Sequence, residues 1–241
     1  MPQHYYGITY LGRGFLAYTV GLSAICSAVF VLIAVWDGWR LKTYGMPPLA
    51  IVSFLSAWLI ALIGPFTNQS HLFPGSRAEF VQFGVPFVLG TIILLQYLRY
   101  GPTDHPLLPH LIDRFRLLLG AQFVAVFTGL WSFVVYYQDY YVNEMEPIQN
   151  LVASGSLLAA AVLRRDLRGL SVTGAWFFLL GNLLLHVAMV AGDLSDPYPD
   201  AAHGYHFIYW LMSTIFVVNL AYAILLRRRK RDGPAQALPI S

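Results

Sequence analysis

Seven long apolar segments, separated by short polar connections, run along the chain. We expect helices over residues of about 14–36, 47–66, 79–100, 115–137, 147–164, 170–191 and 205–226. Most of these segments approach the roughly 20 apolar residues that a helix needs to cross a bilayer. The runs are continuous instead of alternating, and lipid admits only helices or closed barrels, so helices are favoured over strands. The pattern predicts an all-α, polytopic membrane protein that folds as a seven-transmembrane-helix bundle.

Composition agrees with this prediction and leaves no room for a soluble domain. Of the 241 residues, 57% are hydrophobic and 11% are charged, which is far from the balance of a water-soluble domain. The connections between the segments are short. We therefore expect a single membrane domain over residues 1–231, followed by a disordered cytoplasmic tail at 232–241.

The positive charges predict an orientation with the N-terminus outside and the C-terminus in the cytoplasm. Thirteen of the fifteen Lys and Arg residues then lie on inner connections, and only Arg13 and Arg77 lie outside, as the positive-inside rule requires. The basic run Arg227–Arg231 is interpreted as a membrane anchor instead of a nucleic-acid patch. The expected location is the endoplasmic reticulum or endomembrane system in a eukaryote, or the plasma membrane in a bacterium.

The polar groups within the predicted spans are mostly neutral amides and hydroxyls, with one imidazole. Asn182 and His186 are four residues apart and share a helix face, and Asp193 extends that face to the outer end. They could form the polar wall of a cavity with a titratable His186, or they could hydrogen-bond between helices. Gln122 and Asn219 lie at similar depths and could orient a polar ligand group or satisfy one another.

No metal or cofactor is expected. Cys26 is the only cysteine, so thiolate frameworks are excluded. The outer segment Asp193–Asp200 carries three carboxylates that could bind Mg²⁺, but it has no second acidic motif, and a solvated acidic turn explains it equally well. In another outer connection Asn68 begins the sequence Asn-Gln-Ser, a glycosylation site if the host is eukaryotic.

Several short motifs, taken in order, resemble one family of membrane enzymes. They are Tyr44-Gly-Met-Pro47, Ala57-Trp58, Arg99-Tyr-Gly-Pro102, Leu163-Arg-Arg165, Gly169-Leu-Ser171, Ala175-Trp176, Leu180-Gly181 and Asn219-Leu-Ala-Tyr222. Their order and spacing resemble the small seven-span terpene cyclases of fungal meroterpenoid and indole-diterpene biosynthesis, which have bacterial relatives. The resemblance implies an enzyme of secondary metabolism that cyclises a prenylated, sometimes epoxidised, lipophilic substrate through carbocations. Its partners would be an isoprenoid small molecule, the bilayer and other enzymes of the pathway.

The resemblance also implies an apolar pocket whose aromatic rings stabilise carbocations. The candidate substrate-binding residues are Trp58, Phe83, Gln122, Trp131, Trp176 and Asn182. The family has a Glu after the Trp of the second span and an Asp in the seventh. This chain has Leu59, or Trp58 with a one-residue offset, and Asn219 at those places, and neither a hydrocarbon nor an amide can donate the proton. The catalytic candidates are therefore His186, Asn219 and Asp193.

Three mechanisms stay open at this point. The acid could be relocated to Asp193, Glu79 or protonated His186. The protein could direct the shape of a substrate that needs milder activation, or it could be a non-catalytic relative that binds or carries a hydrophobic intermediate. A seven-span receptor or carrier is the rival from another class, although a retinal protein would need a Lys in the seventh span, which has none.

Overall fold

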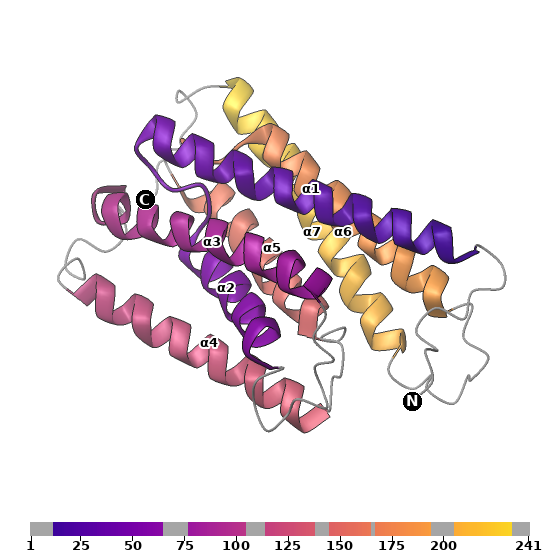
Figure 1. Cartoon of the computed structure of the whole chain (residues 1–241). Coiled ribbons are helices and arrows are strands. Elements are labelled where there is room, and N and C mark those ends of the chain that lie inside the picture. The colour runs from indigo at the N-terminus through magenta and orange to yellow at the C-terminus, as the bar shows by residue number, and fades with distance from the viewer. Residues whose placement is uncertain are drawn as a thin grey trace.

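The computed structural model describes residues 12–64, 77–104, 114–137, 145–164, 167–193 and 205–232. Within these ranges the chain forms seven helices and no strand (Figure 1): α1 Gly12–Leu41, α2 Pro48–Ile63, α3 Arg77–Asp104, α4 Phe115–Tyr137, α5 Met145–Leu163, α6 Val172–Asp193 and α7 Tyr205–Asp232. Each helix lies over one of the seven predicted segments, so the all-helical prediction is confirmed. Of the tail predicted at 232–241, Asp232 is the last residue of α7, and 233–241 lie outside the described residues, as does the sequon at Asn68.

Five of the helices, namely α1, α3, α4, α6 and α7, are long and apolar enough to cross a membrane. The apolar helix α2 is shorter, with 16 residues, and begins with Pro48 directly after an extended Pro47. Proline suits the first helical position because it has no N–H group to leave unpaired there. The 19 residues of α5 include two amides and two serines, which makes it less apolar than its neighbours.

Six of the helices form a closed ring, and α4 lies outside it. Neighbours around the ring follow the order α1, α6, α7, α5, α2 and α3, and α3 returns to α1. The α1–α6 pair is the most extensive, because small residues allow close approach and the Ser23 hydroxyl donates to the Gly181 carbonyl at 2.8 Å. Figure 1 shows α4 at the edge of the molecule, where it packs mainly on α2.

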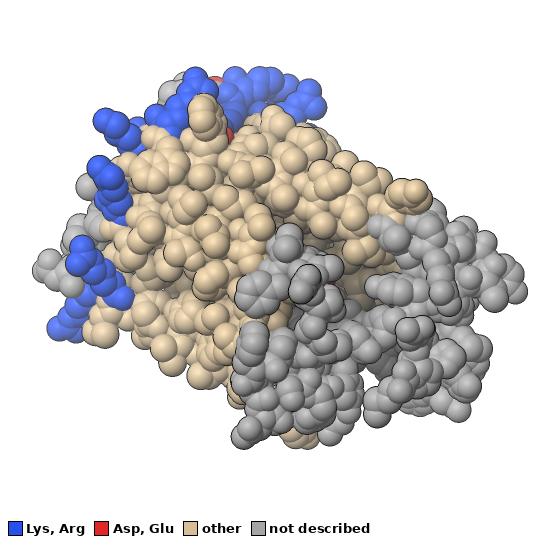
Figure 2. Space-filling model, viewed as in Figure 1, with Lys and Arg blue, Asp and Glu red and all other residues tan. Residues whose placement is uncertain are grey.

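The outer surface of the helices is strongly apolar. Large hydrophobic side chains are exposed on α1, α3, α4, α6 and α7, among them Leu32, Val88, Leu117 and Val217. A water-soluble monomer rarely exposes so continuous an apolar surface, and a lipid environment accounts for it. Figure 2 shows the tan surface bordered by Lys and Arg at one end of the molecule.

Whereas Arg13 and Arg77 stand at the starts of α1 and α3, twelve of the described Lys and Arg residues lie at the end of the bundle where α1, α3 and α7 finish and α4 begins. We call this the basic end; its residues are Arg40, Lys42, Arg99, Arg114, Arg116, Arg164, Arg168, Arg227, Arg228, Arg229, Lys230 and Arg231. Two connections meet there, the α1–α2 loop and the α5–α6 loop. Both take part in the site described next.

Candidate functional site

Helix α5 turns its polar side into the bundle. Gln149, Asn150 and Ser154 are buried, whereas Val152 and Val162 on the other side are exposed. This is the reverse of an amphipathic helix in water and is typical of helices in lipid, where polar groups face their helical neighbours. Gln149 and Asn150 were not among the predicted site residues. Their clustering with Ser154 on one face of an otherwise apolar segment is the signal that could have revealed them.

Ser154, Asn182 and Asn219 come from α5, α6 and α7, of which α7 packs on both of the others, and helix periodicity places them at about the same depth. Nearer the opposite end, Met212 and Ile215 of α7 pack against Leu151 of α5 and against Leu185 and Met189 of α6. Three or four residues along each helix toward the basic end, Ile215 is followed by Asn219, Leu151 by Ser154 and Leu185 by Asn182. All three are buried. We call these three residues the polar layer.

The polar layer contains side chains without hydrogen-bond partners among the described residues. Both side-chain atoms of Asn219 and the hydroxyl of Ser154 are enclosed and unpaired, as is the hydroxyl of Ser56 on the adjacent helix α2. Asn182 differs, because its Nδ2 donates to the Phe178 carbonyl of its own helix at 2.9 Å. An unpaired buried polar group costs about 1–3 kcal/mol. Asn219, which is completely buried, is therefore the side chain with the most to gain from a ligand that hydrogen-bonds.

Aromatic rings fill the bundle next to the polar layer. Phe30 of α1 stacks on Phe178 of α6 with 4.7 Å between centroids, and Phe178 meets Phe54 of α2 edge-on at 6.1 Å. Phe54 in turn stacks on Trp58 at 5.3 Å, and Trp58 fits against Gly90 of α3. These four rings, which we call the aromatic column, reach across the ring of helices from α1 and α6 to α2 and α3.

The structure separates the other rings predicted to line a pocket. Trp58 belongs to the aromatic column, but Trp176 is 38% exposed on the outside of α6. Trp131 lies on α4, where it stacks with Phe127 against α2. Phe83 on α3 and Gln122 on α4 are half-buried. Phe30, Phe54 and Phe178, which the sequence analysis did not select, occupy the interior instead.

The catalytic residues predicted on α6 are His186 and Asp193. His186 follows Asn182 by one turn and is half-buried. Asp193 ends α6, and its side chain lies outside the described residues, as does that of Glu79. The described residues contain no group of three or more His, Cys, Asp or Glu side chains that could hold a metal ion. Of the catalytic candidates, Asn219 alone is placed firmly in the interior.

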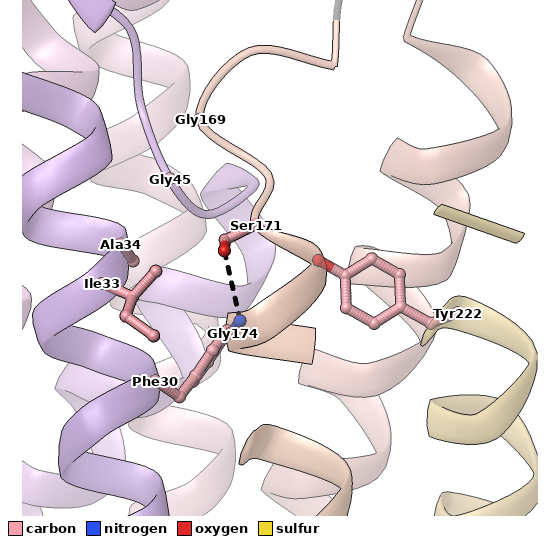
Figure 3. Close-up of a pocket in the computed structure, with 8 residues that line it drawn as sticks. All are labelled: Phe30, Ile33, Ala34, Gly45, Gly169, Ser171, Gly174 and Tyr222. Carbon is pink, nitrogen blue, oxygen red and sulfur yellow. Dashed lines mark hydrogen bonds between the residues drawn. The ribbon is translucent and has the colours of Figure 1, made fainter. Parts of the chain in front are cut away.

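A crevice lies near the basic end, where the two loops meet the helices (Figure 3). It has about 180 Å³ of empty space, part of it open to the outside, and is lined by Phe30, Ile33, Ala34, Gly45, Gly169, Ser171, Gly174 and Tyr222. The Ser171 hydroxyl accepts a hydrogen bond from the Gly174 N–H at 3.2 Å and so caps the start of α6. Pockets for small molecules usually have about 300–1,000 Å³, whereas this crevice has no interior room for even a water-sized sphere, so it is a gap between packed elements and not a ligand cavity.

Several of the motifs that carry the family resemblance meet around this crevice. Gly169 has a φ of +80°, and a Cβ there would lie 2.6 Å from the Tyr44 carbonyl oxygen. The α5–α6 loop therefore packs directly on the α1–α2 loop. The positive φ and this close approach each require glycine at position 169. Tyr222 closes the crevice from α7. These motif residues form one continuous structural unit, although they are far apart in the sequence.

Comparisons of the chain with protein-family models, with curated proteins and with solved structures give no match. The residues that carry a functional inference are therefore those of the polar layer, the aromatic column and the basic end. They offer neutral hydrogen-bonding groups and aromatic faces in the interior, and a concentration of positive charge at one end. A lipophilic ligand with a polar group suits the interior, and an anion suits the basic end.

Proposed function

We propose that all seven helices cross a bilayer, with the N-terminus outside and the basic end in the cytoplasm. The exposed apolar side chains, the inward-facing amides of α5 and the collection of Lys and Arg at one end support this arrangement. The membrane would be the endoplasmic reticulum or endomembrane system in a eukaryote, or the plasma membrane in a bacterium. Within it, the protein is a terpene cyclase-like enzyme that cyclises a prenylated, lipophilic substrate.

The observation that carries this proposal is the buried, unpaired amide of Asn219. It stands where the family that the sequence resembles has an Asp in the seventh span, and both of its polar atoms lack partners among the described residues. Natural interiors rarely leave such a group unsatisfied. A ligand oxygen that hydrogen-bonds to the Asn219 amide would satisfy it, and Ser154 would assist at the same depth.

The aromatic column would receive the hydrocarbon part of the substrate. Phe178 lies one turn from Asn182 and contacts both Phe30 and Phe54. The faces of these rings attract positive charge, so a cation that develops along a prenyl chain would be stabilised beside them. The apolar surroundings would also keep water from capturing that cation early. His186 and Asp193 remain the candidates for moving the proton.

The second candidate function is a non-catalytic protein that binds or carries a hydrophobic intermediate. The chemistry of the polar layer favours it, because the layer consists of two amides and a hydroxyl. Such groups orient a ligand by hydrogen bonds, but they do not protonate an olefin or an epoxide. Binding without turnover is what these three side chains can perform unaided.

Product formation in microsomes separates the two functions. The chain is expressed in yeast, microsomes are supplied with plain and epoxidised farnesyl-aromatic substrates, and cyclised products are measured by mass spectrometry. We expect Asn219→Leu to lower product formation at least tenfold per folded protein. The matched control is Gln96→Leu, which removes a buried amide from α3, where it bonds the Val35 carbonyl at 2.8 Å, far from the polar layer; this variant should retain activity.

The same experiment has two other outcomes. Retention of a radiolabelled substrate by the wild type, without any product, would favour the binding protein over the enzyme. Neither product nor retention, in membranes where the protein is folded, would contradict both functions.

A further inference from the structure

Arg164 occupies an unusual position for a cation at the basic end. It directly follows α5, and its guanidinium carbon lies 4.4 Å from the centre of the Tyr44 ring in the α1–α2 loop. Nη2 is 3.5 Å from both the Thr43 hydroxyl and the Arg168 carbonyl, which is at the limit of a hydrogen bond. Nη1 is enclosed and has no acceptor among the described residues. The guanidinium is thus held in place by a ring and two loops while most of its donors are poorly used.

Capping of α5 does not explain the position of Arg164, because another arginine performs that task. Arg229 of α7 directs its Nη1 to the carbonyls of Ala161, Val162 and Arg164 at the end of α5. These are the carbonyls that a cation near a helix C-terminus usually binds. The Arg164 side chain therefore remains available for a different partner.

The surroundings of Arg164 suit an anion. No ion pair joins it to a carboxylate within the ranges that the structure describes; the side chain of Asp232 pairs with Arg231 instead. The Tyr44 ring that the guanidinium covers packs edge-on against Tyr97 at 4.7 Å between centroids, so two tyrosine rings lie on this side of the cation. Tyr222 lines the crevice, whose neighbour Gly169 packs on Tyr44.

We propose that Arg164 is the central ligand of a phosphate-binding site at the basic end of the bundle. A guanidinium offers paired N–H donors that match two phosphate oxygens, and it does so best where water is partly excluded. Arg168, whose carbonyl lies 3.5 Å from Arg164 Nη2, adds positive charge beside it. The phosphate would come from an anionic phospholipid headgroup or from the diphosphate of a prenyl compound. This site is separate from the polar layer, so it does not depend on the function proposed above.

Native mass spectrometry of the full chain in detergent tests the site. The protein is titrated with phosphatidic acid and with phosphatidylcholine, and inorganic diphosphate is used as a soluble competitor. We expect at least tenfold tighter binding of phosphatidic acid than of phosphatidylcholine. Arg164→Gln should weaken that binding at least tenfold. The control Arg228→Gln removes the same charge from an exposed position at the same end and should change the affinity less than twofold.

Two further variants test whether Arg164→Gln acts through misfolding and whether Asp166 neutralises Arg164. Arg164→Lys keeps the charge and the packing of the stem but loses the paired donors, so it should bind with intermediate affinity even if Arg164→Gln fails to fold. Asp166 is the nearest acid in the sequence, and Asp166→Asn tests whether it neutralises Arg164. Displacement of the lipid by inorganic diphosphate would support a prenyl diphosphate as ligand, and resistance to it would support a lipid headgroup.

Three results would overturn the site. Equal losses in Arg164→Gln and Arg228→Gln would indicate diffuse attraction to the basic end. Equal affinity for the two lipids would show that the negative charge is not recognised. Weak binding by the wild type that becomes at least tenfold tighter in Asp166→Asn would show that the native chain itself supplies the counter-ion.

Discussion

Two buried amides in this bundle differ in their hydrogen bonding: one joins two helices, and the other has no partner among the described residues. Gln96 clasps α3 to α1 by donating to the Val35 carbonyl at 2.8 Å, and Gly38 provides the space, since a Cβ there would collide with the Gln96 side chain. This amide holds two helices together. Asn219 is equally buried but has no partner among the described residues, which we interpret as the mark of a binding group.

Gly38→Ala should destabilise the protein by about 1–3 kcal/mol, because Gln96 must move away and leave a buried amide unpaired. Thermal unfolding in one detergent measures the change. Gly21→Ala on the same helix is the control, since nothing lies within 4 Å of a Cβ at that position; it should be neutral or slightly stabilising. In a Gln96→Ala background, Gly38→Ala should destabilise the protein very little. If Gly38→Ala destabilised the protein equally in that background, Gly38 would be needed for another reason.

Asn219→Leu should raise the free energy of unfolding by about 1–2 kcal/mol, because it removes a buried polar group that has no partner to lose. The same variant should lose activity, so stability and function would change in opposite directions. Thermal unfolding without substrate provides the measurement. Clear destabilisation would mean that the Asn219 amide has a partner, and the site would lose its main support.

At the scale of the helices, the sequence located the segments well but not their rotation about their axes. All seven predicted segments became helices, although α2 is described only to Gly64. In α6, Trp176 was the ring predicted for the interior, but Trp176 faces outward and Phe178 faces inward. The reason is physical: a helix that is apolar all round carries no amphipathic stripe to mark its buried side. Only polar and small residues mark it, as Gln149, Asn150 and Ser154 do on α5.

The docking of α7 on α5 depends on Arg229, which supplies donors to the exposed carbonyls that end α5. Arg229→Met keeps the length of the side chain but removes those donors and should cost about 1–2 kcal/mol. Arg228→Met, at an exposed neighbouring position, should cost much less. Thermal unfolding of the two variants measures the difference in stability. Equal destabilisation by Arg229→Met and Arg228→Met would refute the specific role of Arg229.

At the scale of the whole molecule, a ring of six helices surrounds the aromatic column, with α4 outside and positive charge at one end. The sequence alone indicated the charge asymmetry, since it needs only the order of segments. It could not indicate which helices are neighbours, because the order around the ring differs from the order along the chain. The polar layer and the crevice depend on those neighbours, so they emerge only in three dimensions.

The proposed orientation places the start of α5 and the end of α7 on opposite sides of the membrane. Single cysteines at Glu146 and Arg231, both exposed positions, test this in a background where the buried Cys26 is replaced by Ala. An impermeant maleimide added to sealed right-side-out vesicles should label Glu146→Cys only. Labelling of both cysteines from one side would rule out the arrangement, and labelling of Arg231→Cys alone would invert it.

The most direct measurement of the central claim is photo-crosslinking with a farnesyl-aromatic probe that carries a diazirine on its prenyl chain, followed by peptide mapping. Our account predicts labels on interior residues of the aromatic column, above all Phe54, Trp58 and Phe178, and their loss in Asn219→Leu. Labels confined to outward-facing residues such as Trp176 and Val217, unchanged by Asn219→Leu, would show that the probe only dissolves in the surrounding lipid.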